Sequence, residues 1–172
     1  EVLGCDYAIR KGAQPVDGNY IVISLGYGTC EGALSTPQGL VNRTIFSTHG
    51  LSYAVDIFGQ ELVKNTNIGI KNEHQLDQIF VKGFTYTERK HKDLTKEKRT
   101  AIEIYFKNII MPALRKFIND NDVENAASVY LAGGGAYNEE LITLFRDEFG
   151  DACNVIVPEN PERMASVGYS LY

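Results

Sequence analysis

Two kinds of hydrophobic spacing divide the chain. Residues 19–24 (NYIVIS) and 30–34 (CEGAL) are short apolar runs, and residues 40–47 (LVNRTIFS) alternate apolar with polar positions. These patterns are typical of strands, and the short turns between them predict an antiparallel meander. From Leu51 onward the apolar positions recur every three or four residues, which predicts a helix that begins near Gly50.

Helical spacing continues through the middle of the chain. Residues 73–82 present one apolar face and are followed by Gly83, which we expect to end a short helix. The polar residues 84–94 predict a loop. A long amphipathic helix follows, and Pro112 within it removes a backbone donor, which predicts a bend.

The last third of the chain combines both patterns. Strands are expected at residues 128–132 and 154–158, and helices at residues 137–149 and 161–172. A meander followed by strand–helix–strand–helix units predicts an α/β fold. We therefore expect a mixed five-stranded sheet, a three-strand antiparallel meander plus parallel strands, with helices on both faces and a helical insertion.

Composition excludes several classes of protein. The 172 residues suffice for one domain with a sizeable core, and the net charge is −5. The most basic stretch, residues 88–99, fits a solvated loop and a first helical turn better than a nucleic-acid patch, so we expect no direct contact with nucleic acid. No apolar run reaches the roughly 20 residues of a membrane span and no signal peptide is visible, so we expect no membrane partner and a cytoplasmic location.

Metal and disulfide chemistry find little support in the sequence. Cys5, Cys30 and Cys153 are far apart and form no CxxC pair, which argues against a disulfide framework and a zinc site. The histidines His49, His74 and His91 have no ligand spacing either.

Two glycine-rich segments contain the candidate chemistry. Residues 24–31 (SLGYGTCE) join two predicted strands by a loop longer than a two-residue hairpin turn, and such a loop can direct several backbone donors at one anion. Residues 131–138 (LAGGGAYN) lie where a strand ends and a helix begins, and the free N–H groups of a helix start favour phosphate. The second segment lacks the GxGxxG spacing of dinucleotide sites, and taken alone it fits a structural turn equally well.

Taken together, the two segments resemble motifs of the actin-like ATPases, in the superfamily of actin, sugar kinases and Hsp70. The family's second phosphate motif, Asp-x-Gly-x-x-Thr-x-Asp, is matched at Gly26, Thr29 and, conservatively, Glu31. Its adenosine motif is matched by residues 133–136, and the Gly-Tyr of its last helix by residues 168–169. The chain is most similar to the second half (domain II) of the ParM/StbA plasmid-segregation group, and this resemblance implies a ribonuclease H-like, actin-type domain.

The resemblance also implies an organisation into subdomains. Residues 2–16 resemble the strand and helix that lead into domain II. Residues 1–64 and 126–172 would then form a IIA-like subdomain, and residues 65–125 a IIB-like helical insertion. In filament-forming relatives the surface of that insertion makes contacts between protomers.

Individual site residues follow from the same resemblance. The residues expected to meet the phosphates of ATP or ADP are Gly26, Tyr27, Gly28 and Thr29. Those expected at the ribose and base are Glu61, Lys64, Gly133, Gly134, Gly135, Ala136 and Tyr137. Tyr137 would line the base pocket with Glu139, Arg163 and Met164.

Ser24 departs from the family pattern. The family has an aspartate there, close to Mg²⁺ and its waters, and Ser24 and Glu31 are therefore the candidate catalytic positions. A serine hydroxyl has neither the charge nor the reach of a carboxylate, so we expect weaker Mg²⁺ binding or slower hydrolysis. Nucleotide binding through backbone N–H groups does not depend on this residue, and no protein metal ligand is assigned.

Three functions remain open on the sequence. The first is an ATP-binding, filament-forming actin-like protein that serves plasmid or DNA segregation, with its own copies and a DNA-binding adaptor protein as partners. The second is a non-polymerising relative such as a small-molecule kinase, and the third is a degenerate interaction module. The glycine turn at residues 133–136 favours the first and Ser24 favours the third. We expect ATPase activity of an intact protein and none of this chain alone, because the first half of the family's cleft is missing from it.

Overall fold

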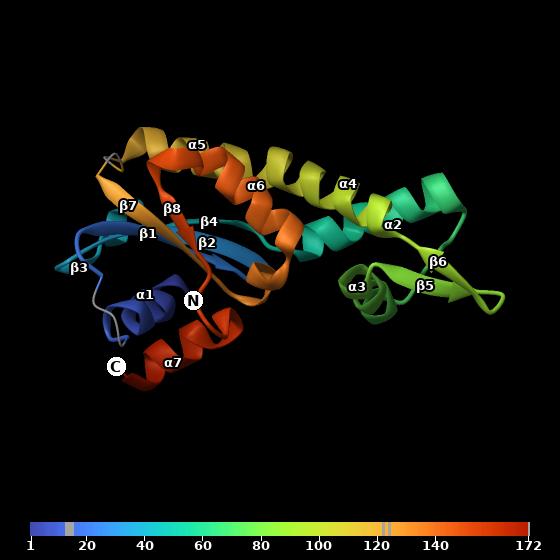
Figure 1. The fold of residues 1–172 in the computed structure, drawn as a ribbon, viewed down its shortest axis with the longest axis horizontal. Helices are drawn as coiled ribbons and strands as arrows, with labels where there is room; N and C mark the ends of the chain where they lie inside the picture. The colour runs from blue at the N-terminus through green and yellow to red at the C-terminus, as the bar shows by residue number, and fades with distance from the viewer. Residues whose placement is uncertain (13–15, 122, 124, 172) are drawn as a thin grey trace.

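A mixed sheet lies between two layers of helices (Figure 1). The computed structural model describes residues 1–12, 16–121, 123 and 125–171, so the other residues of the predicted segments 2–16, 65–125 and 126–172 lie outside it. Within the described residues the sheet has six strands in the order β3-β2-β1-β7-β8, with β4 also paired to β2. The strands are β1 (Asn19–Leu25), β2 (Thr29–Thr36), β3 (Gly39–Leu40), β4 (Phe46–His49), β7 (Ala126–Ala132) and β8 (Asn154–Ile156).

Strand directions bring three carboxyl ends to one edge of the sheet. β1 is antiparallel to β2 but parallel to β7, and β7 is parallel to β8. In this register Ser24 lies opposite Glu31 on one side and beside Ala132 on the other. The ends of β1, β7 and β8 therefore form the kind of edge at which α/β folds bind ligands.

The predicted third strand is divided into two. Between β3 and β4 a 3₁₀ turn spans Asn42–Thr44. The hydroxyl of Thr44 accepts a hydrogen bond from the Leu34 N–H at 2.9 Å and donates one to the Val41 carbonyl at 2.7 Å. A side chain thus replaces the backbone ladder at this point, which is why the expected five-stranded sheet has six strands in the described chain.

Helices cover both faces of the sheet, so the α/β fold class is confirmed. Because strand side chains alternate, Tyr20 and Val22 face α1 and α7, whereas Ile21, Ile23 and Leu25 pack with the helices of the opposite face. Figure 1 shows α1 and α7 on one side and α4, α5 and α6 on the other. The helices are α1 (Val2–Arg10), α2 (Ser52–Thr66), α3 (Glu73–Lys82), α4 (Thr95–Tyr105), α5 (Met111–Asp120), α6 (Glu139–Phe149) and α7 (Met164–Leu171). None of the helices that the structure describes is long and apolar enough to span a membrane.

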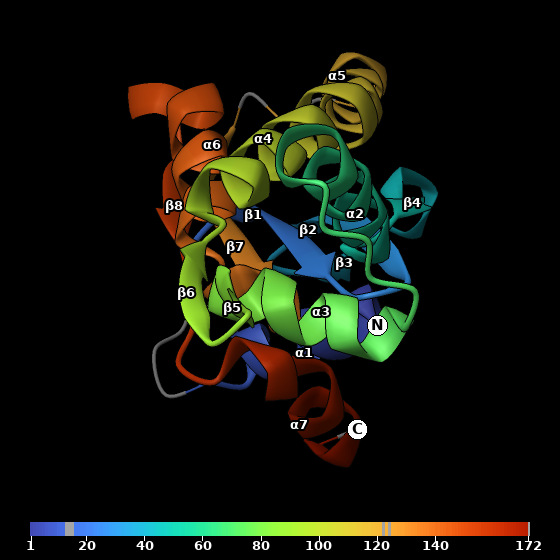
Figure 2. The same cartoon turned by 90° about the vertical axis from the view of Figure 1, so that its right-hand side faces the viewer.

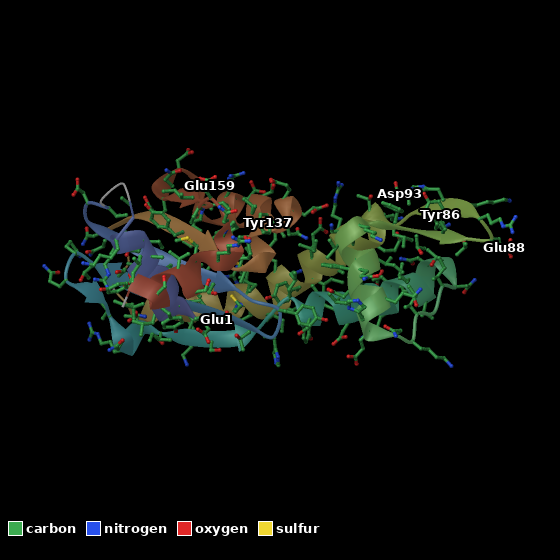
Figure 3. The ribbon with its side chains drawn as sticks, turned by 90° about the horizontal axis from the view of Figure 1, so that it is seen from below. Glu1, Tyr86, Glu88, Asp93, Tyr137 and Glu159 are labelled. Atoms are coloured by element: carbon green, nitrogen blue, oxygen red, sulfur yellow. The ribbon has the colours of Figure 1, made fainter. Side chains whose placement is uncertain are left out.

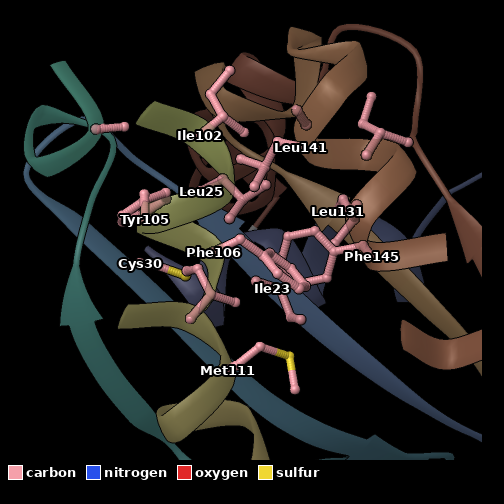
Figure 4. Close-up of a cluster of buried hydrophobic side chains, with 14 of the residues drawn as sticks. Ile23, Leu25, Cys30, Ile102, Tyr105, Phe106, Met111, Leu131, Leu141 and Phe145 are labelled. Carbon is pink, nitrogen blue, oxygen red and sulfur yellow. The ribbon is translucent and has the colours of Figure 1, made fainter. Parts of the chain in front are cut away.

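Two tight contacts define the layers. On one face, α1 and α7 touch at Gly4 and Gly168, where a Cβ on Gly168 would lie 1.7 Å from the Gly4 carbonyl oxygen. The close packing of the two helices therefore explains why the last helix has a glycine at position 168. On the other face, aromatic and aliphatic side chains such as Phe106 and Phe145 interlock (Figure 4), with ring centroids 5.1 Å apart. Of the strand and helix expected at residues 2–16, the described part forms only α1.

The segment between α2 and α4 extends to one end of the molecule (Figures 1 and 2). It contains α3 and a hairpin of β5 (Phe84–Thr87) and β6 (Lys90–Asp93), so the expected loop at 84–94 was wrong. All four β6 residues are exposed, and a strand without a buried face has no alternating pattern to detect. The predicted long helix is interrupted by a π-helical turn over Phe106–Ile110, just before Pro112. The subdomain boundaries at residues 64 and 125 stay a prediction.

Candidate functional site

The turn between β1 and β2 is shorter than the sequence suggested. The Gly26 N–H donates to the Thr29 carbonyl at 2.9 Å, which leaves only Tyr27 and Gly28 at the tip. The expected long loop is therefore wrong, and the segment is a two-residue hairpin turn. No described residue accepts a hydrogen bond from the N–H of Tyr27 or Gly28, so these donors are open to a ligand. We call residues 26–29, where the resemblance places the nucleotide phosphates, the phosphate turn.

The glycine segment after β7 adopts a conformation that only glycine reaches easily. Gly133 has φ 84° and ψ 167°, and a Cβ there would lie 2.5 Å from the Leu25 carbonyl oxygen. Gly134 opens a 3₁₀ turn, Gly134–Tyr137, and a Cβ on it would meet no atom within 4 Å. The helix α6 begins only after Asn138, whose side chain caps it. The glycines therefore lie between the strand β7 and the helix α6, as the sequence predicted, and the helix begins two residues later than expected.

A small hollow of about 150 Å³ lies between these two segments. It opens at the shared carboxyl edge of β1 and β7, and residues from both turns and both outer helices line it. The lining residues are Glu1, Cys5, Ser24, Gly26, Gly133, Gly134, Pro161, Glu162 and Ala165. Sequence positions about a hundred residues apart thus meet in one place, as the resemblance implied.

Glu1 is a site residue that the sequence reasoning missed. The hydroxyl of Ser24, only 2% exposed, donates to the Glu1 carboxylate at 3.3 Å. The same carboxylate lies 3.1 Å from the position of a Cβ on Gly26. A carboxylate therefore stands beside Ser24 even though the family's aspartate is absent. Its place at the start of α1 gives no periodic pattern that could reveal it from sequence.

Glu31 is paired with Ser24 across the two strands, and its carboxylate is hydrogen-bonded to the start of α1. Its carboxylate accepts hydrogen bonds from the backbone nitrogen of Glu1 at 3.0 Å and from the Val2 N–H at 3.2 Å. Burial alone would raise the pKa of Glu31, but these two donors lower it overall. The two candidate catalytic residues, Ser24 and Glu31, are thus brought together, and the carboxylate of Glu31 serves as a cap for α1.

Other predicted residues lie outside the hollow. Ala136 is buried in the core, and Gly135 packs so closely on Leu25 that a Cβ on it would lie 2.8 Å from the Leu25 Cβ. Both residues therefore pack against the core and do not line the hollow. Tyr137 is exposed, and its hydroxyl donates to Glu162 on the rim. Figure 3 shows Tyr137 and Glu1 in the central part of the molecule, far from the hairpin residue Glu88.

The residues predicted on α2 do not reach the hollow either. Glu61 pairs with Lys64 at 3.6 Å and with the Asn65 side chain at 3.1 Å, and none of these residues lines it. Tyr27 is exposed and does not line the hollow. Slight burial and the charges of Asp77, Asp56 and Glu73 raise the pKa of Tyr27.

Comparison with solved structures shows in which proteins this fold recurs. The archaeal actin homologue Ta0583 matches with a TM-score of 0.77 and 17% identity, over 98% of this chain and 52% of that one. The fold is that of half an actin-like protein. MreB5 of Spiroplasma citri, bound to ADP, matches at TM-score 0.75 and 12% identity, over 99% of this chain and 58% of that one. A ParM filament from Clostridium botulinum matches at TM-score 0.69 and 17% identity, over 96% and 49%.

These similarities concern the actin-like fold. The chain spans about half the length of the solved structures it matches. No protein-family model and no curated protein sequence matches it.

Proposed function

We propose that this actin-like half-molecule binds the phosphates and sugar of an adenine nucleotide in the hollow, as part of an ATP-driven, self-assembling protein. The hollow itself is the main support, because Gly26 of the phosphate turn meets Gly133 and Gly134 in it at the carboxyl edge of parallel strands. The N–H groups of Tyr27 and Gly28, which follow Gly26, have no acceptor among the described residues and can serve an anion at this place. At Gly134 the backbone has no side chain between it and a ligand. The fold is shared with an ADP-bound MreB and with a ParM filament, which is consistent with both parts of the proposal.

The donor set fits a nucleotide with Mg²⁺. Magnesium is usually held by phosphate oxygens, waters and one or two carboxylates, and the hollow offers the Glu1 carboxylate beside the Ser24 hydroxyl. No cluster of three potential ligands is present among the described residues, so the phosphates would have to supply the remaining coordination. The metal would neutralise phosphate charge, and Glu1 would orient or deprotonate the attacking water.

The presence of Glu1 weakens the case for a degenerate module. That alternative depended on the loss of negative charge at Ser24, and a carboxylate oxygen lies 3.3 Å from its hydroxyl. We therefore favour an ATPase whose filaments act in plasmid or DNA segregation through a DNA-binding adaptor. Hydrolysis and filament growth belong to the protein as a whole, of which this chain is about half by comparison with the matched structures.

Nucleotide titration followed by an assembly assay tests the proposal. With the full-length protein, calorimetry should show binding of ATP and ADP. Light scattering with negative-stain microscopy should show filaments with ATP that are fewer with ADP or without nucleotide. In the Glu1→Gln variant of the full-length protein, hydrolysis should fall by about 10²–10⁴-fold while nucleotide affinity is retained. The control Glu88→Gln changes an exposed carboxylate on the distant hairpin and should behave like the unmodified protein. Absence of nucleotide binding by the unmodified protein would refute the proposed function.

A further inference from the structure

Three backbone hydrogen bonds join the phosphate turn to the start of α2. The Gly50 N–H donates to the Gly28 carbonyl at 3.0 Å, the Leu51 N–H to the Gly26 carbonyl at 3.0 Å, and the Ser52 N–H to the Tyr27 carbonyl at 2.9 Å. No side chain caps α2, so the carbonyls of the turn satisfy donors that a helix start would otherwise leave free. We call these three bonds the turn–helix clamp.

The clamp determines which way the peptide units of the turn face. In a trans peptide the carbonyl and the following N–H point in opposite directions. With the carbonyls of Gly26, Tyr27 and Gly28 held by α2, the N–H groups of the next residues point away from α2. An anion beside the turn thus meets donors, and the carbonyl oxygens that would repel it are turned away.

Gly50 is the residue on which this contact depends. A Cβ there would lie 2.5 Å from the carbonyl oxygens of both Gly26 and Tyr27, and 2.6 Å from the Thr29 nitrogen. Its φ lies outside the left-handed region, so the need for glycine arises from the close approach of two backbones. An added methyl group must move the turn or the helix start, because all three neighbouring atoms belong to the backbone.

We propose that Gly50 is a positioning residue that holds the N–H groups of the phosphate turn toward nucleotide phosphates. The proposal rests on the proposed function and adds to it a residue outside the hollow. It predicts that loss of the clamp weakens recognition of phosphate and leaves recognition of adenosine intact, because the turn at residues 133–134 belongs to another strand.

The variant Gly50→Ala, compared with Gly69→Ala, tests this inference. Gly69 lies in the linker between α2 and α3, where a Cβ meets no atom within 4 Å and φ is unstrained, so it is a matched control. Calorimetry with ATP and with adenosine should show a loss of about tenfold or more in ATP affinity for Gly50→Ala, and less than about twofold for adenosine. Gly69→Ala should leave both affinities unchanged.

Other results would overturn the inference. An equal loss for ATP and adenosine would mean that Gly50 only maintains the fold, and unchanged ATP affinity would mean that the clamp does not position the turn. If Gly50→Ala fails to fold, the inference can be tested by hydrogen exchange of the unmodified protein. ATP should slow exchange of the Leu51 and Ser52 amide hydrogens more than adenosine does. Equal protection by the two ligands would refute the role. If the unmodified protein binds neither ligand, the proposed function itself fails.

Discussion

Two adjacent glycines, Gly133 and Gly134, should respond differently to substitution by alanine. Gly133→Ala should lower stability, and Gly134→Ala should lower nucleotide affinity. At Gly133 an alanine would have to adopt φ 84° and ψ 167°, with its Cβ 2.5 Å from the Leu25 carbonyl oxygen. The backbone region costs about 1–3 kcal/mol and the forced contact about 1–3 kcal/mol more. Gly133→Ala should therefore lower the free energy of unfolding by about 2–6 kcal/mol, which corresponds to about 5–20 °C in Tm for a chain of this length.

Gly134→Ala adds the same methyl group without strain. No atom lies within 4 Å of its Cβ and φ is outside the left-handed region, so stability should change by less than about 1 kcal/mol. Gly134 lines the hollow, however, so the added methyl group takes space that is open to a ligand there, and adenosine and ATP affinity should both fall by about tenfold or more.

Urea denaturation followed by circular dichroism gives the first quantity, and calorimetry gives the second. The reasoning fails if both variants lose the same stability, because Gly133 alone would then not be conformationally required. It also fails if Gly134→Ala binds nucleotide normally, since the hollow would then not be the ligand site.

Two further predictions concern buried groups. The Asp6 carboxylate is fully buried and accepts hydrogen bonds from the Tyr20 hydroxyl at 2.7 Å and from Arg10 at 2.9 Å. Asp6→Ala should therefore lower the free energy of unfolding, measured by urea denaturation, by at least about 1–3 kcal/mol. Asp6→Asn keeps an acceptor and should lower it clearly less. Burial raises the pKa of the Cys5 thiol to about 11 and that of Cys30 to about 12. Since unfolded thiols ionise near about pH 8.5, their contribution to stability should be complete below that pH and decline toward pH 11–12. The decline should be smaller in a Cys5→Ala, Cys30→Ala double variant, and equal declines would contradict this account.

Local spacing was sufficient for most of the fold. The strands near residues 19–24 and 128–132 and the amphipathic helix that starts near Gly50 each bury one face or both, and burial imposes a period on the sequence. The hairpin at residues 84–93 was missed because its outer strand buries nothing. The division of the third strand was missed because Thr44 bonds to Leu34, a partner ten residues away.

The candidate site was only partly predictable. The sequence by itself determined two glycine segments, their places at strand ends and the departure at Ser24, because chemistry of this kind depends on residue type and short spacing. Only the tertiary structure decided that Glu1 stands beside Ser24, that Gly50 touches the phosphate turn and that Ala136 is buried beneath the hollow. These are contacts between elements distant in the chain, and no local pattern encodes which backbones and side chains of such elements will meet.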